Sequence, residues 1–333
     1  WTRRWLTERE ECKMKAFKLT PAFTDYLWGG TRLRDEFGKD CSYDKVAESW
    51  ELSCHPDGQS VIATGPDAGM KLGDYLEREG RRVWGSHCDS FDRFPILIKL
   101  IDARDNLSVQ VHPDDEYGLR VEGEYGKTEM WYVVDCDPGA SLIYGFQKEI
   151  TKEEFRSRIA GNTLLEVVNT VPVHPGDTFF IEAGTLHAIG AGILIAEIQQ
   201  NSNTTYRVYD FGRVGADGKP RTLHIDKAVD VTRLGPPQRP VGAQEKPVVG
   251  EGYTSALLAG CPNFTVKELT LSGHFDGCAD ETSFHTILSL AEELVLEMEG
   301  ERLPLKRGET VFIPASSGSY RLTGSGKALL TTI

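Results

Sequence analysis

Four side chains that can bind a metal ion stand at the ends of strand-like stretches in this sequence. Gln110 and His112 are two residues apart in the alternating run SVQVH, and residues i and i+2 of a strand point to the same face. Pro113 ends this strand, because proline has no N–H to donate to a neighbouring strand. After a polar turn, Glu129 opens the apolar stretch EMWYVV, and His187 follows much later in GDTFFIEAGTLHAIG.

These four side chains offer two imidazole nitrogens, an amide oxygen and a carboxylate oxygen, a set that suits a divalent ion such as zinc. Because only the carboxylate is charged, a bound 2+ ion would keep about one positive charge and could polarise a substrate. A single histidine is more often a hydrogen-bonded structural residue, so the interpretation depends on Glu129 and His187 occurring together with the Gln-x-His pair. The pattern predicts a catalytic metal centre rather than a structural one.

Composition and charge limit the partners of this chain. Its 333 residues are 40% hydrophobic and 26% charged, which is typical of a globular protein large enough for two domains. The formal net charge is −13, which disfavours nucleic acid and anionic membrane surfaces as partners. An anionic substrate would therefore have to meet a local cluster of lysine and arginine side chains.

The cysteines and the hydropathy pattern point to a reducing compartment. Seven cysteines are scattered along the chain, and none forms a CxxC pair, which argues against both a disulfide framework and a cysteine zinc site. No stretch is long and apolar enough to predict a transmembrane helix. We expect a cytoplasmic protein in which residues 1–13 are an N-terminal extension, because Met14 opens a strand-like stretch.

Strand-like stretches separated by turn residues predict a mainly β fold of two barrels. We expect residues 14–215 to form the first barrel, with its N-terminal strands and a short helical insert over 151–168. Residues 216–250 predict a helix and a proline-rich connection, and residues 251–333 predict a second strand-rich domain.

An internal repeat supports two barrels of like topology. GDTFFIEA at 176–183 matches GETVFIPA at 308–315 at six of eight positions when Asp and Glu are grouped. At the same offset of 132 residues, His187 corresponds to Ser319. The second barrel is therefore expected to lack the metal ligands and to serve as a structural partner.

Several motifs in this order resemble those of the type I mannose-6-phosphate isomerase family in its short bacterial form. GDTFFIEAGTLH resembles the second cupin motif, with Glu182 where proline is usual. SVQVHPDDEYG, GKTEMWYVV, AGTLHAIG and EIQQNSNTTYRVYD together resemble the isomerase family, and the resemblance covers most of residues 14–333. It implies two cupin-type (jelly-roll) barrels with a few short helices, the first of them catalytic.

The resemblance also implies an activity and a set of site residues. It implies a zinc-dependent aldose–ketose isomerase that interconverts mannose 6-phosphate and fructose 6-phosphate through an enediol(ate), with one Zn²⁺ per chain. Carried over by motif, the metal ligands are Gln110, His112, Glu129 and His187. The same comparison gives the active-site residues Arg207, Glu197 and Lys127, with Lys99, Ser108, Lys127 and Arg207 near the substrate phosphate.

The residue types agree with this chemistry but leave the proton carrier open. Glu197 is flanked by apolar residues, and burial would raise its pKa, which suits a general base. Lys127 or a metal-bound water could serve instead. Arg207 can hold a phosphate with two hydrogen bonds, or it can pair with Asp210 or Glu197. Lys99, inside FPILIKLI, must lie on a solvated face or in a polar cavity.

Two other functions compete with the isomerase. One is a catalytically silent sugar-phosphate-binding regulator on the same fold, against which the intact ligand set and Arg207 argue. The other is an iron or manganese dioxygenase, which would usually have histidine where this chain has Gln110. The expected ligand is a sugar phosphate. The chain is expected to be a monomer or to form a weak homo-oligomer.

Overall fold

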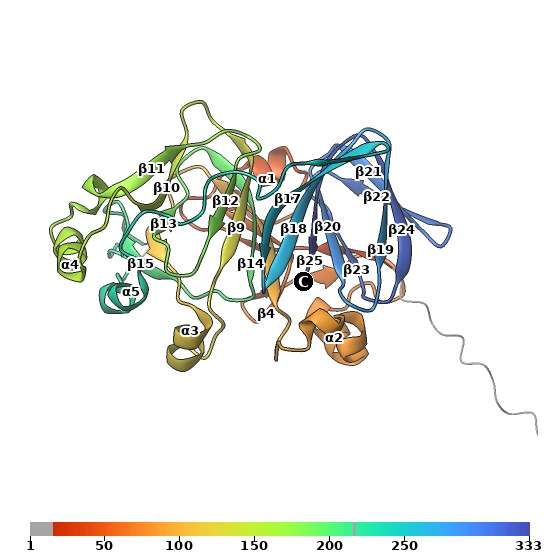
Figure 1. The fold of residues 1–333 in the computed structure, drawn as a ribbon, viewed down its shortest axis with the longest axis horizontal. Helices are drawn as coiled ribbons and strands as arrows, with labels where there is room; N and C mark the ends of the chain where they lie inside the picture. Colours follow the sequence, from red (N-terminus) through yellow and green to blue (C-terminus); the bar gives the residue numbers. More distant parts are fainter. Residues whose placement is uncertain (1–15, 216–217) are drawn as a thin grey trace, which may run out of the picture.

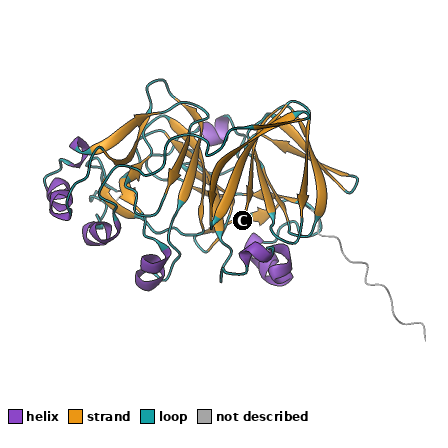
Figure 2. Cartoon of the chain, viewed as in Figure 1, coloured by secondary structure: helices purple, strands orange, loops and turns teal. Residues whose placement is uncertain are grey.

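A computed structural model describes residues 16–215 and 218–333 of the chain. It consists of two β-barrels side by side, each built from two facing sheets, with short helices at the periphery (Figure 1, Figure 2). The prediction of a mainly β fold of two barrels is confirmed. The expected N-terminal extension, residues 1–13, lies outside the described residues.

The first barrel is formed by the middle of the chain. One of its sheets has six antiparallel strands, in the order β12 (Thr178–Ile181), β9 (Glu129–Cys136), β14 (Ile193–Gln200), β7 (Ile96–Ala103), β3 (Glu48–Leu52) and β2 (Ala22–Thr24). The facing sheet has five strands, in the order β11 (Val168–Pro172), β10 (Ser141–Phe146), β13 (His187–Ala188), β8 (Val109–Val111) and β15 (Tyr206–Tyr209). A two-stranded ribbon of β4 (Cys54–His55) and β5 (Gly58–Gln59) follows β3.

The second barrel contains the C-terminal strands. Its larger sheet has eight strands, in the order β16 (Val248–Gly250), β17 (Tyr253–Cys261), β18 (Phe264–Leu271), β25 (Gly326–Thr332), β20 (His285–Ser289), β23 (Thr310–Ile313), β1 (Phe17–Thr20) and β6 (Val61–Ile62). Its smaller sheet has four, in the order β19 (His274–Ala279), β24 (Gly318–Gly324), β21 (Glu293–Met298) and β22 (Glu301–Lys306).

Two N-terminal strands belong to the second barrel, although the sequence analysis assigned them to the first. β1 pairs with β23 through Phe17 and Phe312, and β6 pairs with β1. The barrels also share one hydrophobic core, in which residues such as Ile98 and Phe180 cluster with Phe264. The N-terminal segment thus spans both barrels, and the proposed domain limits at 215 and 250 stay a prediction.

The helices cover the outside of the barrels and agree largely with the sequence. They are α1 (Arg32–Asp35), α2 (Leu72–Glu79), α3 (Asp115–Val121), α4 (Lys152–Ala160) and α5 (Ile225–Val231), with short 3-10 turns at Gly80–Val83, Ser86–Cys88 and Leu164–Glu166. The predicted insert over 151–168 is α4 and the turn after it, and the Thr151 side chain caps α4 by accepting from Glu154 N–H. None of the helices in the described ranges is long and apolar enough to span a membrane.

Helix α3 was not predicted. The stretch between His112 and Glu129 was expected to be a polar turn, but α3 forms there, with Asp114 accepting from Tyr117 N–H at its N-terminus. Gly118 inside the helix weakens its sequence signal, yet Glu124 and Tyr125 carbonyl oxygens lie within 3.0 Å of where a Cβ would stand at this position. The close packing of the following loop therefore requires glycine.

Candidate metal centre and active-site cavity

Strand register brings the predicted ligands together inside the first barrel. Gln110 on β8 lies opposite His187 on β13 and, on its other side, opposite Arg207 on β15. His112 follows β8, two residues after Gln110 and on the same face. Glu129 begins β9 on the facing sheet. The structure thus places side chains from distant parts of the sequence around one point.

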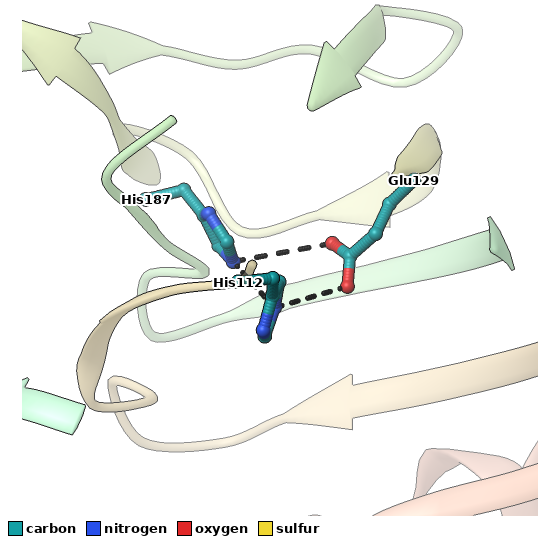
Figure 3. Close-up of side chains that lie close together, drawn as sticks. All are labelled: His112, Glu129 and His187. Carbon is teal, nitrogen blue, oxygen red and sulfur yellow. Dashed lines mark hydrogen bonds and ion pairs between the residues drawn. The ribbon is translucent and has the colours of Figure 1, made fainter. Parts of the chain in front are cut away.

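His112, Glu129 and His187 converge closely, and all three are buried (Figure 3). The two Nε2 atoms of the histidines are 3.1 Å apart. Glu129 Oε1 lies 3.2 Å from His112 Nε2, and Glu129 Oε2 lies 3.9 Å from His187 Nε2. Ligands about 2.0–2.2 Å from one zinc ion in a tetrahedron stand roughly 3.3–3.5 Å from each other, so these separations suit such an ion.

Hydrogen bonds to backbone carbonyl groups determine which nitrogen of each histidine ring faces the other ligands as an acceptor. His112 Nδ1 lies 2.8 Å from Thr204 O, and His187 Nδ1 lies 2.8 Å from Thr185 O. A carbonyl oxygen only accepts hydrogen bonds, so each Nδ1 carries the proton and each Nε2 presents a lone pair. Two lone pairs and a carboxylate that face one another attract a cation. The donor set therefore fits a divalent metal.

The pKa shifts agree with deprotonated ligands. Burial, assisted by the charge of Lys127, lowers the pKa of His112 to about 3, and burial also lowers the pKa of His187. Burial opposes ionisation of Glu129, but Lys127 and His112 outweigh it and hold the pKa of Glu129 well below its usual range. Near neutral pH, both imidazoles are neutral and the carboxylate is charged, as metal ligands must be.

Gln110 stands at the edge of this cluster. Its amide Nε2 is 3.5 Å from His187 Nε2, and its Oε1 is 3.5 Å from the Ser108 hydroxyl. The two ends of an amide are assigned from hydrogen bonding, and a half-turn of this group directs the oxygen at the same point as the histidines. The fourth predicted ligand is thus within reach of the site.

Lys127 and Glu197 also reach the centre. Lys127 Nζ is 2.6 Å from Glu129 Oε1 and 3.4 Å from His112 Nε2. Trp131 Nε1 donates to both Glu129 Oε2, at 3.0 Å, and Glu197 Oε2, at 2.9 Å. Burial, and then the charge of Glu129, raise the pKa of Glu197 to about 7. Glu197 is thus a buried carboxyl group with a pKa suited to proton transfer near neutral pH.

Lys99 lies in a polar cavity, one of the two locations that the sequence allowed. Its ammonium is 3.3 Å from Glu48 Oε2, 3.8 Å from Glu197 Oε1 and 4.7 Å from the centre of the Trp50 ring. Burial opposes its charge, but the pKa of Lys99 is nevertheless raised by the two carboxylates. Lys99 therefore stays charged and is already neutralised by its neighbours.

A cavity of about 210 Å³ lies beside the candidate metal centre and is lined by two arginines, Arg207 and Arg221. Among the predicted residues, Lys99, Ser108, Gln110, Lys127, Glu197 and Arg207 all line it. Within the described ranges, no ion pair joins Arg207 to Asp210 or Glu197, the alternative partners considered from the sequence. Arg207 instead donates from Nη1 to Thr222 O, at 3.1 Å, while its Nε is buried without a hydrogen-bond partner in the described parts of the chain.

Tyr26 and Arg221 line the cavity, but the sequence analysis did not identify either as a site residue. Burial raises the pKa of Tyr26 to about 12, so its hydroxyl stays protonated. Arg221 belongs to the segment 216–250, which was read as a connection between the domains. Arg221 lies close to Arg207 and Asp210 in the sequence. Only the folded loop between them shows that it lines the cavity and pairs with Asp210.

Comparisons with known proteins agree with this site. Residues 16–132 match the catalytic domain of phosphomannose isomerase type I, and residues 254–333 match the cupin domain of mannose-6-phosphate isomerase. The first match contains Gln110, His112 and Glu129, and the second supports the predicted cupin fold of the C-terminal barrel.

Similar proteins extend the match to most of the chain. Mannose-6-phosphate isomerase from Streptococcus mutans is 40% identical over 299 residues, which cover 90% of this chain and 92% of the relative. The structure of mannose 6-phosphate isomerase from Bacillus subtilis matches with a TM-score of 0.88 and 35% identity, over 96% of this chain and 99% of the other. A zinc-bound mannose 6-phosphate isomerase shares the fold at 19% identity, with a TM-score of 0.77 over 95% and 98% of the two chains. The chain therefore belongs to the type I mannose-6-phosphate isomerase family.

Proposed function

We propose that this protein interconverts mannose 6-phosphate and fructose 6-phosphate and binds one Zn²⁺ per chain. The observation that carries the proposal is the convergence of two imidazole lone pairs and a buried carboxylate next to a cavity that Glu197, Lys127 and Arg207 line. The relative from Streptococcus mutans, which bears the name of this enzyme, supports the choice of substrate.

The metal would be held by Gln110, His112, Glu129 and His187. Their two nitrogens and two oxygens suit zinc, and the carbonyl groups of Thr185 and Thr204 keep both imidazole rings in the orientation that binding needs. When bound, zinc would supply positive charge that favours the developing enediol(ate).

The reaction moves two protons and no other atoms. The proton on C2 of the aldose is removed and one is added at C1, while the proton of the C2 hydroxyl is lost and one is gained by the oxygen on C1. Glu197 is our candidate for the transfer between carbons, because its pKa near 7 allows it to take and return a proton near neutral pH. Trp131 Nε1 holds one of its oxygens in place at 2.9 Å.

Lys127 is our candidate for the group that faces the substrate oxygens. Its ammonium is buried and lies 2.6 Å from Glu129, so it is held among the metal ligands and can donate to an oxygen in the cavity. It remains the alternative to Glu197 as proton carrier. The Ser108 hydroxyl lies 3.5 Å from Gln110 Oε1, where it can bind a sugar oxygen beside the ligand set, and its assignment to the phosphate stays a prediction.

We assign Lys99 a different task from phosphate binding. Its charge is shared between Glu48 and Glu197, and a phosphate dianion would have to displace two carboxylates from a buried position. Lys99 instead orients Glu197 from the side opposite Trp131. The expectations of a cytoplasmic location and of a monomer or weak homo-oligomer stay predictions.

A coupled assay tests the proposal. The purified protein is assayed for conversion of mannose 6-phosphate to fructose 6-phosphate as isolated, after chelation, and after zinc is added back. We expect activity to disappear with the chelator and to return with zinc. A protein that holds one zinc per chain and binds mannose 6-phosphate without turning it over would overturn the isomerase and favour the silent regulator.

A further inference from the structure

The turn after β12, residues 182–185, has a counterpart after β23, residues 314–317. In both turns the N–H of the fourth residue donates to the carbonyl oxygen of the first, at 3.0 Å and 3.3 Å, and the third residue has a positive φ, of 86° and 64°. The second barrel begins this turn with Pro314, whose ring restricts the backbone, whereas the first barrel begins it with Glu182. In the first barrel, something other than proline must therefore hold the turn.

Glu182 is paired with two arginines of the segment that follows α5. Arg233 Nη1 donates to one oxygen of the Glu182 carboxylate, and Arg239 Nε donates to the other at 3.3 Å. Cζ of Arg239 also lies 3.9 Å from the centre of the Phe180 ring on β12, which favours the same placement of this guanidinium. A single exposed ion pair stabilises little, but the Glu182 side chain is only 24% exposed and both of its oxygens are paired.

The same segment contacts the backbone of the turn. Arg233 N–H donates to Gly184 O at 2.8 Å. A Cβ at Gly184 would lie 2.8 Å from Val231 O and 3.1 Å from Arg233 Cγ, so the segment lies directly against this residue. The chain from Val231 to Arg239 thus holds the turn through both its first side chain and its backbone.

This turn in turn contacts both histidines of the candidate metal centre. Gly184 N–H donates to His112 O at 2.8 Å, and Thr185 O accepts from His187 Nδ1 at 2.8 Å. The second of these hydrogen bonds directs His187 Nε2 at the other ligands. Because distances between a metal and its ligands must lie within about 0.2 Å of their preferred values, a small displacement of the Thr185 carbonyl group would weaken metal binding.

We propose that Glu182, through its ion pairs with Arg233 and Arg239, positions the turn 182–185 and thereby orients His187 for metal binding. This inference rests on the proposed function for the identity of the metal. Glu182 would be a positioning residue, because it acts through the Thr185 carbonyl group rather than by binding the ion. The segment after α5, which the sequence analysis read only as a connection, would then be part of the support of the metal centre.

The test measures metal binding directly. The zinc affinity of the wild type and of Glu182→Gln is determined by competition with a chelator, and the visible spectrum of the cobalt-substituted proteins reports the geometry of the ligands. We expect Glu182→Gln to weaken zinc binding about tenfold and to change the cobalt spectrum, since residues beyond the direct ligands commonly have effects of this size.

A proline variant separates positioning from charge. Glu182→Pro removes the carboxylate but restricts the backbone as Pro314 does, and Ile181 before it already has the strand conformation that a residue before proline prefers. If Glu182 acts by holding the turn, Glu182→Pro should recover most of the zinc affinity that Glu182→Gln loses. Equal losses of zinc affinity in the two variants would contradict the inference.

The arginines provide a second test, in which charge and positioning predict opposite results. The double variant Arg233→Gln, Arg239→Gln removes two positive charges, which through charge alone would strengthen the binding of a cation. If the arginines hold Glu182, zinc binding should instead weaken about as much as in Glu182→Gln, and that is the result we expect. Stronger zinc binding in the double variant would overturn the inference, even where Glu182→Pro fails to fold.

A matched control lies in the second barrel. Glu309 pairs with Lys18 at 2.7 Å, and its side chain is 31% exposed, similar to that of Glu182. Glu309→Gln should leave zinc affinity and the cobalt spectrum unchanged. If Glu182→Gln behaves like this control while the wild type turns over mannose 6-phosphate, the inference is wrong and the proposed function stands.

The wild type distinguishes the remaining outcomes. A wild type that binds zinc without isomerase activity, and whose zinc affinity falls in Glu182→Gln but not in Glu309→Gln, would overturn the proposed activity and keep the inference. A wild type that binds no zinc would overturn both.

Discussion

The two barrels share a strand order but differ in what fills them. Read from β12, the six-stranded sheet of the first barrel runs β12-β9-β14-β7-β3-β2. The large sheet of the second barrel, read from β23, runs β23-β20-β25-β18-β17-β16, and β1 and β6 extend it on the other side of β23. Inside the first barrel, seven ionisable side chains of the described residues are buried together: Glu48, Lys99, His112, Lys127, Glu129, His187 and Glu197. Inside the second barrel, the buried cluster is apolar, with residues such as Leu294, Leu296 and Leu322 fully enclosed.

Strand register identifies which residues of the second barrel stand at the positions of the proposed metal ligands. Tyr320 lies opposite Gly277 as His187 lies opposite Gln110, and Ala279 follows two residues later, where the first barrel has His112. His285 lies opposite Ile313 as Glu129 lies opposite Ile181. The equivalents of Gln110, His112, Glu129 and His187 are therefore Gly277, Ala279, His285 and Tyr320.

At the positions of the candidate metal centre, the second barrel has a neutral hydrogen-bonded contact. Tyr320 OH and His285 Nδ1 are 2.8 Å apart, and burial lowers the pKa of His285 to about 4, so the imidazole is neutral at pH 7. Burying several charges is unfavourable unless each is paired, whereas an apolar interior stabilises the fold directly. The charged groups inside the first barrel therefore lower the stability of the fold, and the apolar interior of the second barrel raises it.

The strongest test exchanges equivalent residues of the two barrels. His187→Ala should remove a metal ligand, so that the protein retains little zinc and its turnover falls more than about a thousandfold. Tyr320→Phe, at the equivalent position, should keep zinc and turnover per folded molecule and lower the free energy of unfolding by about 1–3 kcal/mol, because His285 loses its partner. Metal analysis, kinetics and denaturant titration measure the three quantities. Equal loss of zinc in both variants would contradict the division of roles.

The contrast between the barrels also explains how far the sequence could be interpreted. Alternation and apolar runs predicted the strands, because burial on one or both faces leaves that pattern directly, as for β14 and β7. The Gln-x-His pair predicted two ligands on one face for the same reason. The four expected ligands lie together in the structure, but that they bind metal stays a prediction.

The remaining features depend on loops, which leave weaker signals. The repeat offset assigned Ser319 to the position of His187, but Ser319 is exposed and Tyr320 points inward. Tyr320 comes seven residues after Ile313, whereas His187 comes six residues after Ile181, and a difference of one residue reverses the face of a strand. Arg221 was missed because its pairing with Asp210 spans a loop whose path no periodicity reveals.

A second test concerns Glu197. Strand pairing places Leu330 at the equivalent position of the second barrel. Burial and the charge of Glu129 raise the pKa of the Glu197 carboxyl group to about 7. If Glu197 accepts the C2 proton, kcat/KM should therefore rise with pH as this carboxyl group loses its own proton. A zinc ion on Glu129 would offset that charge, so the midpoint in the loaded enzyme should fall below 7.

Glu197→Gln distinguishes this role from a structural one. The amide oxygen can still accept from Trp131 Nε1, so zinc should be retained while kcat falls about 10²–10⁴-fold and the acidic limb of the pH profile disappears. Near-wild-type turnover with a full complement of zinc would exclude Glu197 as the base and leave Lys127 or a metal-bound water as the candidates.

The smallest expected effect tests the register that equates Gly277 with Gln110. A Cβ at Gly277 would lie 2.2 Å from Cζ of Tyr320, so the ring occupies the space that a side chain of residue 277 would need. Gly277→Ala should therefore destabilise the protein by about 1–3 kcal/mol with zinc content and turnover unchanged. The same substitution should have little effect in a Tyr320→Ala background, where that space is open, and denaturant titration of the four proteins measures the coupling. Additive effects would mean that Tyr320 does not fill the place that Gln110 and His187 share in the first barrel.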